Sequence, residues 1–106
     1  MNYDEFTLTT IRYPKVQENP EVIEAMYCAL GLAGEAGETV DKVKKWHRDG
    51  TIDKHAVALE LGDTLYYLTR LANTFGFTLE QIQVMNVEKL LSRKQRGVLT
   101  GSGDNR

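Results

Sequence analysis

Apolar residues recur at helical spacing along most of the chain. From Pro20 to about Arg48, apolar positions three or four residues apart fall on one side of a helix. A second stripe with the same spacing runs over 53–75, and Asp49-Gly50 separates the two, because glycine often follows the last turn of a helix. We therefore predict two long amphipathic helices. Their stripes are Ile23, Met26, Leu30, Ala33, Gly37 and Val40, then Val57, Leu61, Leu65, Leu68, Ala72 and Phe75.

Two shorter helices flank this pair. Residues 4–12 predict a short helix that ends before Pro14, since the residue before a proline disfavours the helical conformation. Thr78 followed by Gln81 predicts a capping box, so a fourth helix runs from 78 to about 95. Apolar and polar residues do not alternate convincingly anywhere in the sequence, so we predict no strand. The sequence predicts an all-α, four-helix, bundle-like protomer, with one domain over 1–97 and a flexible glycine-rich tail over 98–106.

Composition narrows the class of protein. The net charge of −2 does not fit a general nucleic-acid binder, which usually carries a basic excess. The sequence contains no run of about 18 apolar residues, so it predicts no membrane span. The single cysteine, Cys28, cannot form an intramolecular disulfide, so we expect a buried structural thiol in a cytoplasmic protein. A chain of 106 residues buries a small core, so assembly into an oligomer would help to stabilise it.

Two pairs of acidic residues interrupt the apolar pattern. Glu35 and Glu38 lie in the first long helix, and Glu60 and Asp63 lie in the second, so each pair projects from one side of its helix. Among the four, only Glu38 has a cation one turn away, Lys42. Carboxylates beside an apolar stripe need cations from elsewhere, and four from two helices would suit hard divalent ions such as Mg²⁺ or Mn²⁺. The alternative is a set of surface acids on a helix kinked at its glycines.

Small residues surround the first acidic pair. Each glycine in a helix costs about 1 kcal/mol relative to alanine, so their number requires a reason. A side of the helix without side chains would let another helix approach closely and bring the two acidic pairs together. The residues concerned are Ala33, Gly34, Ala36 and Gly37, and Gly62 could serve the same purpose on the second long helix.

Basic residues gather in the fourth helix. Asn86, Lys89 and Arg93 fall within about 60° of one another at a step of about 100° per residue. Such a group opposite an acidic metal site would suit a phosphorylated ligand. The alternative is a solvated basic turn that complements the helix dipole. Trp46, the only tryptophan, is either a core residue or a platform for a nucleotide base.

Three segments in this order resemble the MazG-like nucleotide pyrophosphohydrolases of the all-α NTP pyrophosphatase superfamily: "GLAGEAGETVDKVKKW", "LELGDTLYYLTRLA" and "NVEKLLSRKQRG". The family motif is ExxE on one helix, ExxD on the next, and a later helix with Asn and Lys or Arg; the resemblance covers roughly 25–97. It implies hydrolysis of an NTP or dNTP to the monophosphate and pyrophosphate. It also implies Mg²⁺ as cofactor, with Mn²⁺ as a substitute, and a homodimer or homotetramer that removes aberrant or excess nucleotides.

The resemblance also implies roles for single residues. One of Glu35 and Glu38 would be the general base for a water that attacks the α-phosphorus. The metal ligands would be Glu35, Glu38, Glu60 and Asp63. The residues that contact the substrate would be Asn86, Lys89, Arg93 and Trp46. A dUTPase-type or phosphoribosyl-ATP-type substrate stays open, because one sequence does not show the shape of the base pocket.

Two other classes of protein remain as alternatives. A di-iron carboxylate bundle typically uses Glu-x-x-His pairs, and neither acidic pair here has a histidine at the third position. A non-enzymatic helical module, for interaction or metal binding, could use the same amphipathic faces. Such a module would not need acids grouped beside an apolar stripe.

Overall fold

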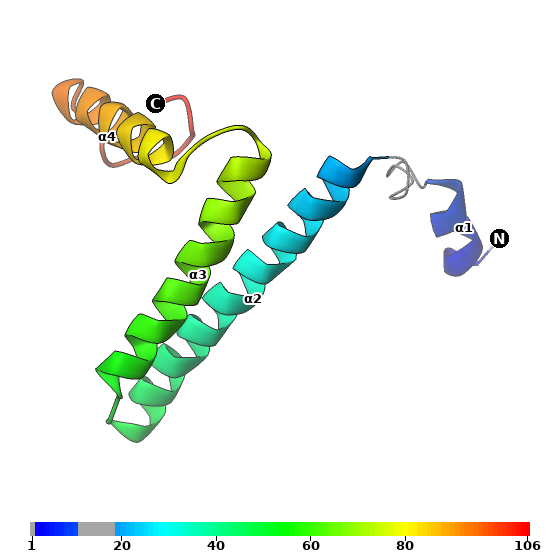
Figure 1. Ribbon diagram of the computed structural model, residues 1–106, viewed down its shortest axis with the longest axis horizontal. Coiled ribbons are helices and arrows are strands. Elements are labelled where there is room, and N and C mark those ends of the chain that lie inside the picture. The colour runs from blue at the N-terminus through cyan, green and yellow to red at the C-terminus, as the bar shows by residue number, and fades with distance from the viewer. Residues whose placement is uncertain (1, 11–18) are drawn as a thin grey trace.

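The structure is a computed structural model that describes residues 2–10 and 19–106. Its helices are α1 (Tyr3–Thr9), α2 (Pro20–Asp49), α3 (Lys54–Thr74) and α4 (Leu79–Gln95) (Figure 1). These ranges contain no strand, so the all-α prediction with four helices is confirmed. The first helix ends at Thr9 with Thr10 as its C-cap, and residues 11 and 12 of the predicted range lie outside the described residues.

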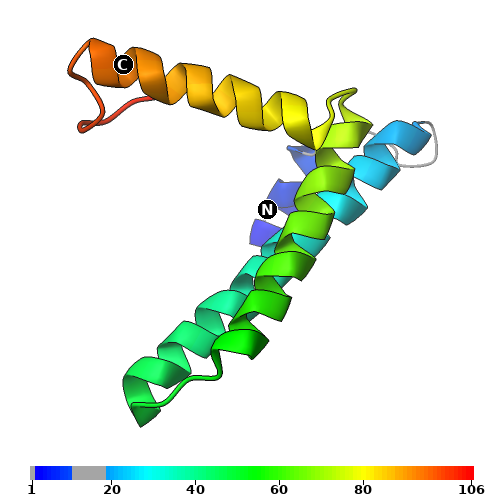
Figure 2. The same ribbon diagram turned by 60° about the vertical axis from the view of Figure 1, so that its left-hand side comes forward.

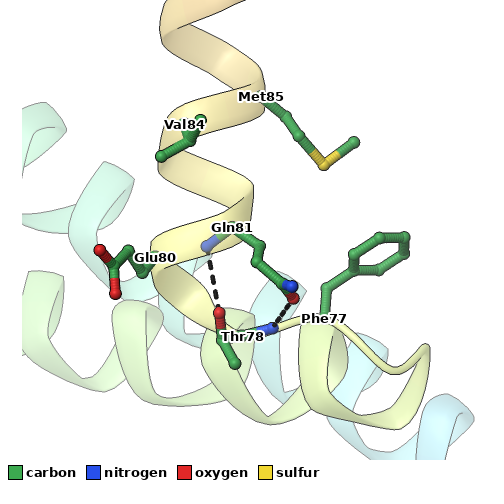
Figure 3. A pocket seen from close by; sticks show the side chains of 6 residues that line it. All are labelled: Phe77, Thr78, Glu80, Gln81, Val84 and Met85. Atoms are coloured by element: carbon green, nitrogen blue, oxygen red, sulfur yellow. Dashed lines mark hydrogen bonds between the residues drawn. The ribbon is translucent and has the colours of Figure 1, made fainter.

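Local side-chain hydrogen bonds mark where the helices begin. Asp53 Oδ1 accepts a hydrogen bond from the Ala56 amide (3.1 Å) at the start of α3. At the start of α4, the Gln81 amide donates to Thr78 Oγ1 (3.1 Å) and the Thr78 amide donates to Gln81 Oε1 (2.9 Å) (Figure 3). This is the predicted capping box. Gly50 follows the last residue of α2, also as predicted.

Helices α2 and α3 form an antiparallel hairpin, side by side in both views (Figures 1 and 2). Glu24 and Arg70 form an ion pair across its open end (3.3 Å). Gly31 lies directly against the ring of Tyr67, because a Cβ built at position 31 would come within 2.5 Å of that ring. The expected burial of Cys28 is confirmed, at 5% exposure.

Helix α4 does not fold back along the hairpin. It contacts α3 near the Phe75–Phe77 corner and extends away from α2 (Figure 2). The radius of gyration is 19.0 Å, whereas a compact domain of this length would have about 13 Å. None of the described helices is long and apolar enough to cross a bilayer.

The apolar stripe predicted for α2 faces solvent in the single chain. Leu30 is 71% exposed and Val40 is 66% exposed, and Leu61 on α3 is 53% exposed. The reason is that α2 meets α3 through a different side, the one that carries Cys28 and Gly31. One protomer therefore provides a single layer of helices whose apolar faces are left largely uncovered.

The contact at Gly31 yields a prediction about stability. Gly31→Ala should lower the free energy of unfolding by up to about 2 kcal/mol, because forcing the Tyr67 ring aside costs roughly 1–3 kcal/mol and the better helix propensity of alanine recovers about 1 kcal/mol. Gly62→Ala is the control, since a Cβ at position 62 meets nothing within 4 Å. Denaturant unfolding measures both variants. An alanine at 31 as well tolerated as one at 62 would contradict the close packing.

Candidate metal centre

Three of the four predicted acids meet between α2 and α3. Glu35 and Glu38 from α2 and Glu60 from α3 each place one carboxylate oxygen within 4.8 Å of the others. Glu35 and Glu60 are partly buried, whereas Glu38 is exposed. The spacing of three residues turns both α2 glutamates toward the same region, and the hairpin brings Glu60 to it.

Asp63 lies outside this group of three. It follows Glu60 by one helical turn and its residue is exposed. Its negative charge still raises the pKa of Glu35, although less than burial and Glu38 do. Asp63 therefore borders the carboxylate group without sharing its closest contacts.

The three glutamates bring negative charge together without enough positive charge nearby to balance it. The pKa of Glu35 is raised, first because burial removes water from its carboxylate and then by the charge of Glu38. The pKa of Glu60 is raised, first by a hydrogen bond with Glu38, which requires one of the two carboxyls to be protonated, and then by burial. Glu35 Oε2 and Glu60 Oε2 are buried and have no hydrogen-bond partner. Such atoms are costly to leave unsatisfied.

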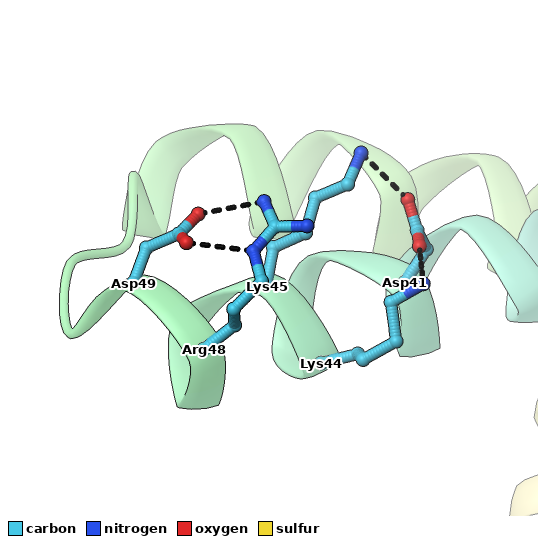
Figure 4. A network of polar contacts seen from close by, with 5 residues as sticks. All are labelled: Asp41, Lys44, Lys45, Arg48 and Asp49. Carbon is cyan, nitrogen blue, oxygen red and sulfur yellow. Dashed lines mark hydrogen bonds and ion pairs between the residues drawn. The ribbon is translucent and has the colours of Figure 1, made fainter.

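The cations nearby on α2 are mostly paired elsewhere. Asp41 binds Lys44 and Lys45, each at 2.9 Å (Figure 4), and these lysines lower the pKa of Asp41 to about 2. Arg48 binds Asp49 at 2.7 Å. Lys42 acts on the group directly, because its charge opposes the rise in the pKa of Glu60.

An open hollow of about 470 Å³ adjoins the carboxylates. Its lining residues are Gly34, Gly37, Glu38, Asp41, Lys42 and Glu60. Sequence reasoning did not include Asp41, although its position three residues after Glu38 places both acids on one side of α2.

The glycines of α2 divide into two kinds. Gly31 permits the close approach to α3, whereas a Cβ at Gly34 or Gly37 would meet nothing within 4 Å. The prediction that Gly34, Gly37 and Gly62 permit close helix packing is therefore wrong for this chain, because all three face open space. Gly34 and Gly37 instead leave the wall of the hollow free of side chains.

The predicted substrate ligands are not beside these carboxylates. At a rise of about 1.5 Å per residue, Asp63 is roughly 16 Å from the end of α3 and Lys89 is roughly 15 Å along α4, which extends away from the hairpin (Figure 2). Asn86 and Arg93 lie on the same helix. Trp46 is 49% exposed near the end of α2 and does not line the hollow.

The donor set fits a hard divalent cation. Carboxylate oxygens are the ligands that Mg²⁺ and Mn²⁺ prefer. Two of them, on Glu35 and Glu60, are buried and unpartnered, and the adjacent hollow leaves room for water and a ligand. A positive charge among these carboxylates would favour their charged forms and so oppose the rise in the pKa of Glu35 and of Glu60.

Comparisons with known proteins agree with this chemistry. Residues 27–98 match the family described as the MazG nucleotide pyrophosphohydrolase domain. The chain is 42% identical over 102 residues to the Gene 37 protein of Mycobacterium phage L5, across 92% of this chain and 90% of that protein. No solved structure matches significantly. The family match spans more than half of the chain and includes the four acids and the basic residues of α4, so the chain belongs to the MazG nucleotide pyrophosphohydrolase family.

Proposed function

We propose that this protein is a Mg²⁺-dependent pyrophosphohydrolase that converts an NTP or dNTP to the monophosphate and pyrophosphate, as house-cleaning of the nucleotide pool. Membership of the MazG family supports a pyrophosphohydrolase activity. The observation that carries the metal dependence is the pair of buried, unpartnered oxygens on Glu35 and Glu60 beside Glu38. A hydrolase that acts on a polyanion needs cations at this point.

The carboxylates of α2 and α3 have separate tasks in this proposal. Glu35 and Glu60 would hold the cation from the interior, and Asp63 would add a carboxylate from the next turn of α3. When bound, Mg²⁺ would neutralise phosphate charge and make a water at the site more acidic, and Mn²⁺ could replace it. Glu38 is exposed and lines the hollow, so it is better placed than Glu35 to accept the proton of the attacking water.

The triphosphate would occupy the hollow beside Glu38. Lys42 is the cation on its wall, and Gly34 and Gly37 leave space for the phosphate chain. Attack at the α-phosphorus would release pyrophosphate. Trp46 lies 8 residues beyond Glu38 on α2, about 12 Å away along the helix, and would contact the base from that end.

The phosphate ligands on α4 require a second copy of the chain. Asn86, Lys89 and Arg93 lie on α4, which extends away from the hairpin that carries the carboxylates, and the exposed stripes of α2 and α3 would need another apolar surface to cover them. A homodimer or homotetramer meets both needs, because one protomer covers the stripes of its partner and its basic helix reaches the partner's acidic centre. Opposite charge favours that arrangement.

Product analysis tests the activity. The protein should release monophosphate and pyrophosphate from some members of a panel of NTPs and dNTPs with Mg²⁺, and release nothing with EDTA. Glu60→Gln should lower the rate by at least about a hundredfold, because it removes a charged ligand of the cation. Diphosphate plus phosphate would overturn the position of attack. No turnover of any nucleotide would favour a non-enzymatic metal-binding module.

Thermal unfolding tests the metal site separately from turnover. Mg²⁺ or Mn²⁺ should raise the Tm of the native protein, because an ion that binds only the folded state stabilises it. In the absence of metal, Glu60→Gln should raise the Tm, since it removes one of the converging charges, and added metal should then have little effect. Glu88→Gln, an exposed acid on α4, is the matched control and should respond to metal like the native protein. Equal responses in all three proteins would exclude the assigned ligands.

Light scattering during gel filtration tests the assembly. The native protein should elute as a dimer or tetramer, and Leu30→Lys should shift it toward the monomer, because a charge would replace a side chain in the exposed stripe of α2. Leu99→Lys makes the same change in the tail and should leave the mass unaltered. A native monomer would contradict this part of the proposal.

A further inference from the structure

The last nine residues, 98–106, turn back against the end of α4. The Val98 amide donates to the Arg93 carbonyl (2.8 Å). Gly101 and Gly103 have φ values of 123° and 95°, which side chains disfavour and which let the segment reverse direction. We call this segment the C-terminal latch, and its expected flexibility stays a prediction.

The latch covers Arg93. Nη2 of Arg93 donates to the carbonyl oxygen of Asp104 (2.9 Å), and the residue is only 7% exposed. Within the part of the chain that the structure describes, it is the only buried charged residue, and its neighbours on α4 are exposed. A side chain predicted to bind phosphate therefore already has a protein partner.

Arg106 holds the latch closed. Its guanidinium donates to the carbonyl oxygens of Val98 (3.1 Å), Leu99 (3.2 Å) and Gly103 (2.7 Å). Among the described residues, neither Arg93 nor Arg106 forms an ion pair. The side-chain hydrogen bonds of both guanidinium groups thus go to neutral carbonyl oxygens.

We propose that the C-terminal latch is an autoinhibitory strap that withholds Arg93 until a phosphate chain displaces it. A phosphate oxygen carries charge and bonds a guanidinium roughly twice as strongly as a neutral carbonyl does. An arriving phosphate chain can therefore compete for Arg93, whereas a neutral ligand cannot. Asn86 and Lys89 precede Arg93 at spacings of three and four residues and extend the same polar face.

This inference rests on the proposed function in one respect only, which is that the anion is a phosphate. The test therefore uses inorganic pyrophosphate without a divalent metal, so that the carboxylate centre takes no part. Calorimetry measures the affinity, and ¹⁵N relaxation measures the order of residues 98–106, with order parameters near about 0.85 for a rigid backbone and below about 0.6 for a flexible one.

Arg106→Ala removes the three hydrogen bonds and leaves Arg93 intact. It should loosen 98–106 and tighten pyrophosphate binding by roughly five- to tenfold, because a larger fraction of the protein has Arg93 free. Arg96→Ala is the matched control: it removes one positive charge, but its Nε donates to Ser92 Oγ and holds no part of the latch. This control should bind pyrophosphate no more tightly than the native protein and should keep 98–106 ordered.

In the native protein, saturating pyrophosphate should mobilise 98–106. Pyrophosphate that orders this segment further would show that it closes over the ligand, and would overturn the latch. So would an Arg106→Ala protein that binds no more tightly than Arg96→Ala, or one that binds no pyrophosphate. Circular dichroism checks that both variants are folded. Product analysis tests the hydrolase proposal independently, because hydrolysis of a nucleotide can be measured whether or not residues 98–106 move.

Discussion

The contact between α2 and α3 is the interaction on which the rest of the structure depends. It is the one extensive contact between helices in the described residues, and Gly31 makes it close enough for the Tyr67 ring to lie on the α2 backbone. The same contact brings Glu35, Glu38 and Glu60 together, with two oxygens buried and unpartnered. A stabilising contact and a repulsive one are therefore inseparable, and a divalent cation would remove the repulsion without opening the hairpin.

The other consequence of this hairpin is that it leaves most of the apolar surface of its two helices uncovered. Its apolar stripes remain exposed, and α4 is held by α3 only near the corner. Hydrophobic surface of this extent is unusual on a protein that remains a monomer. The three glutamates meet within one chain, whereas the proposed assembly would cover the exposed apolar surfaces around them. The proposed metal binding and the proposed assembly would thus use different sides of the same two helices.

How much the sequence could predict depended on how local each feature is. The capping box of Thr78 and Gln81 spans one turn, so spacing alone predicted it. The acidic pairs were recognisable because each lies on one helix. The way in which the helices pack against one another was not recognisable in the sequence. Periodicity identified the stripe that contains Leu30, but it could not tell whether α3 or another chain would cover that stripe. For the same reason Gly34 and Gly31 looked alike in the sequence, although only Gly31 has a ring against it. The bond from Arg93 to the Asp104 carbonyl involves the backbone and leaves no residue pattern to read.

The short connection between α2 and α3 has a consequence for the order of folding. Only Gly50–Asp53 separate the two helices, so the hairpin closes through contacts that are near in sequence and therefore form quickly. The carboxylates can therefore gather within a single chain, before any assembly. Each folding chain would then carry its own group of carboxylates, and the basic side chains of α4 would join that group only on assembly. Such a division would let substitutions at the outer faces change the assembly without disturbing Glu35, Glu38 and Glu60.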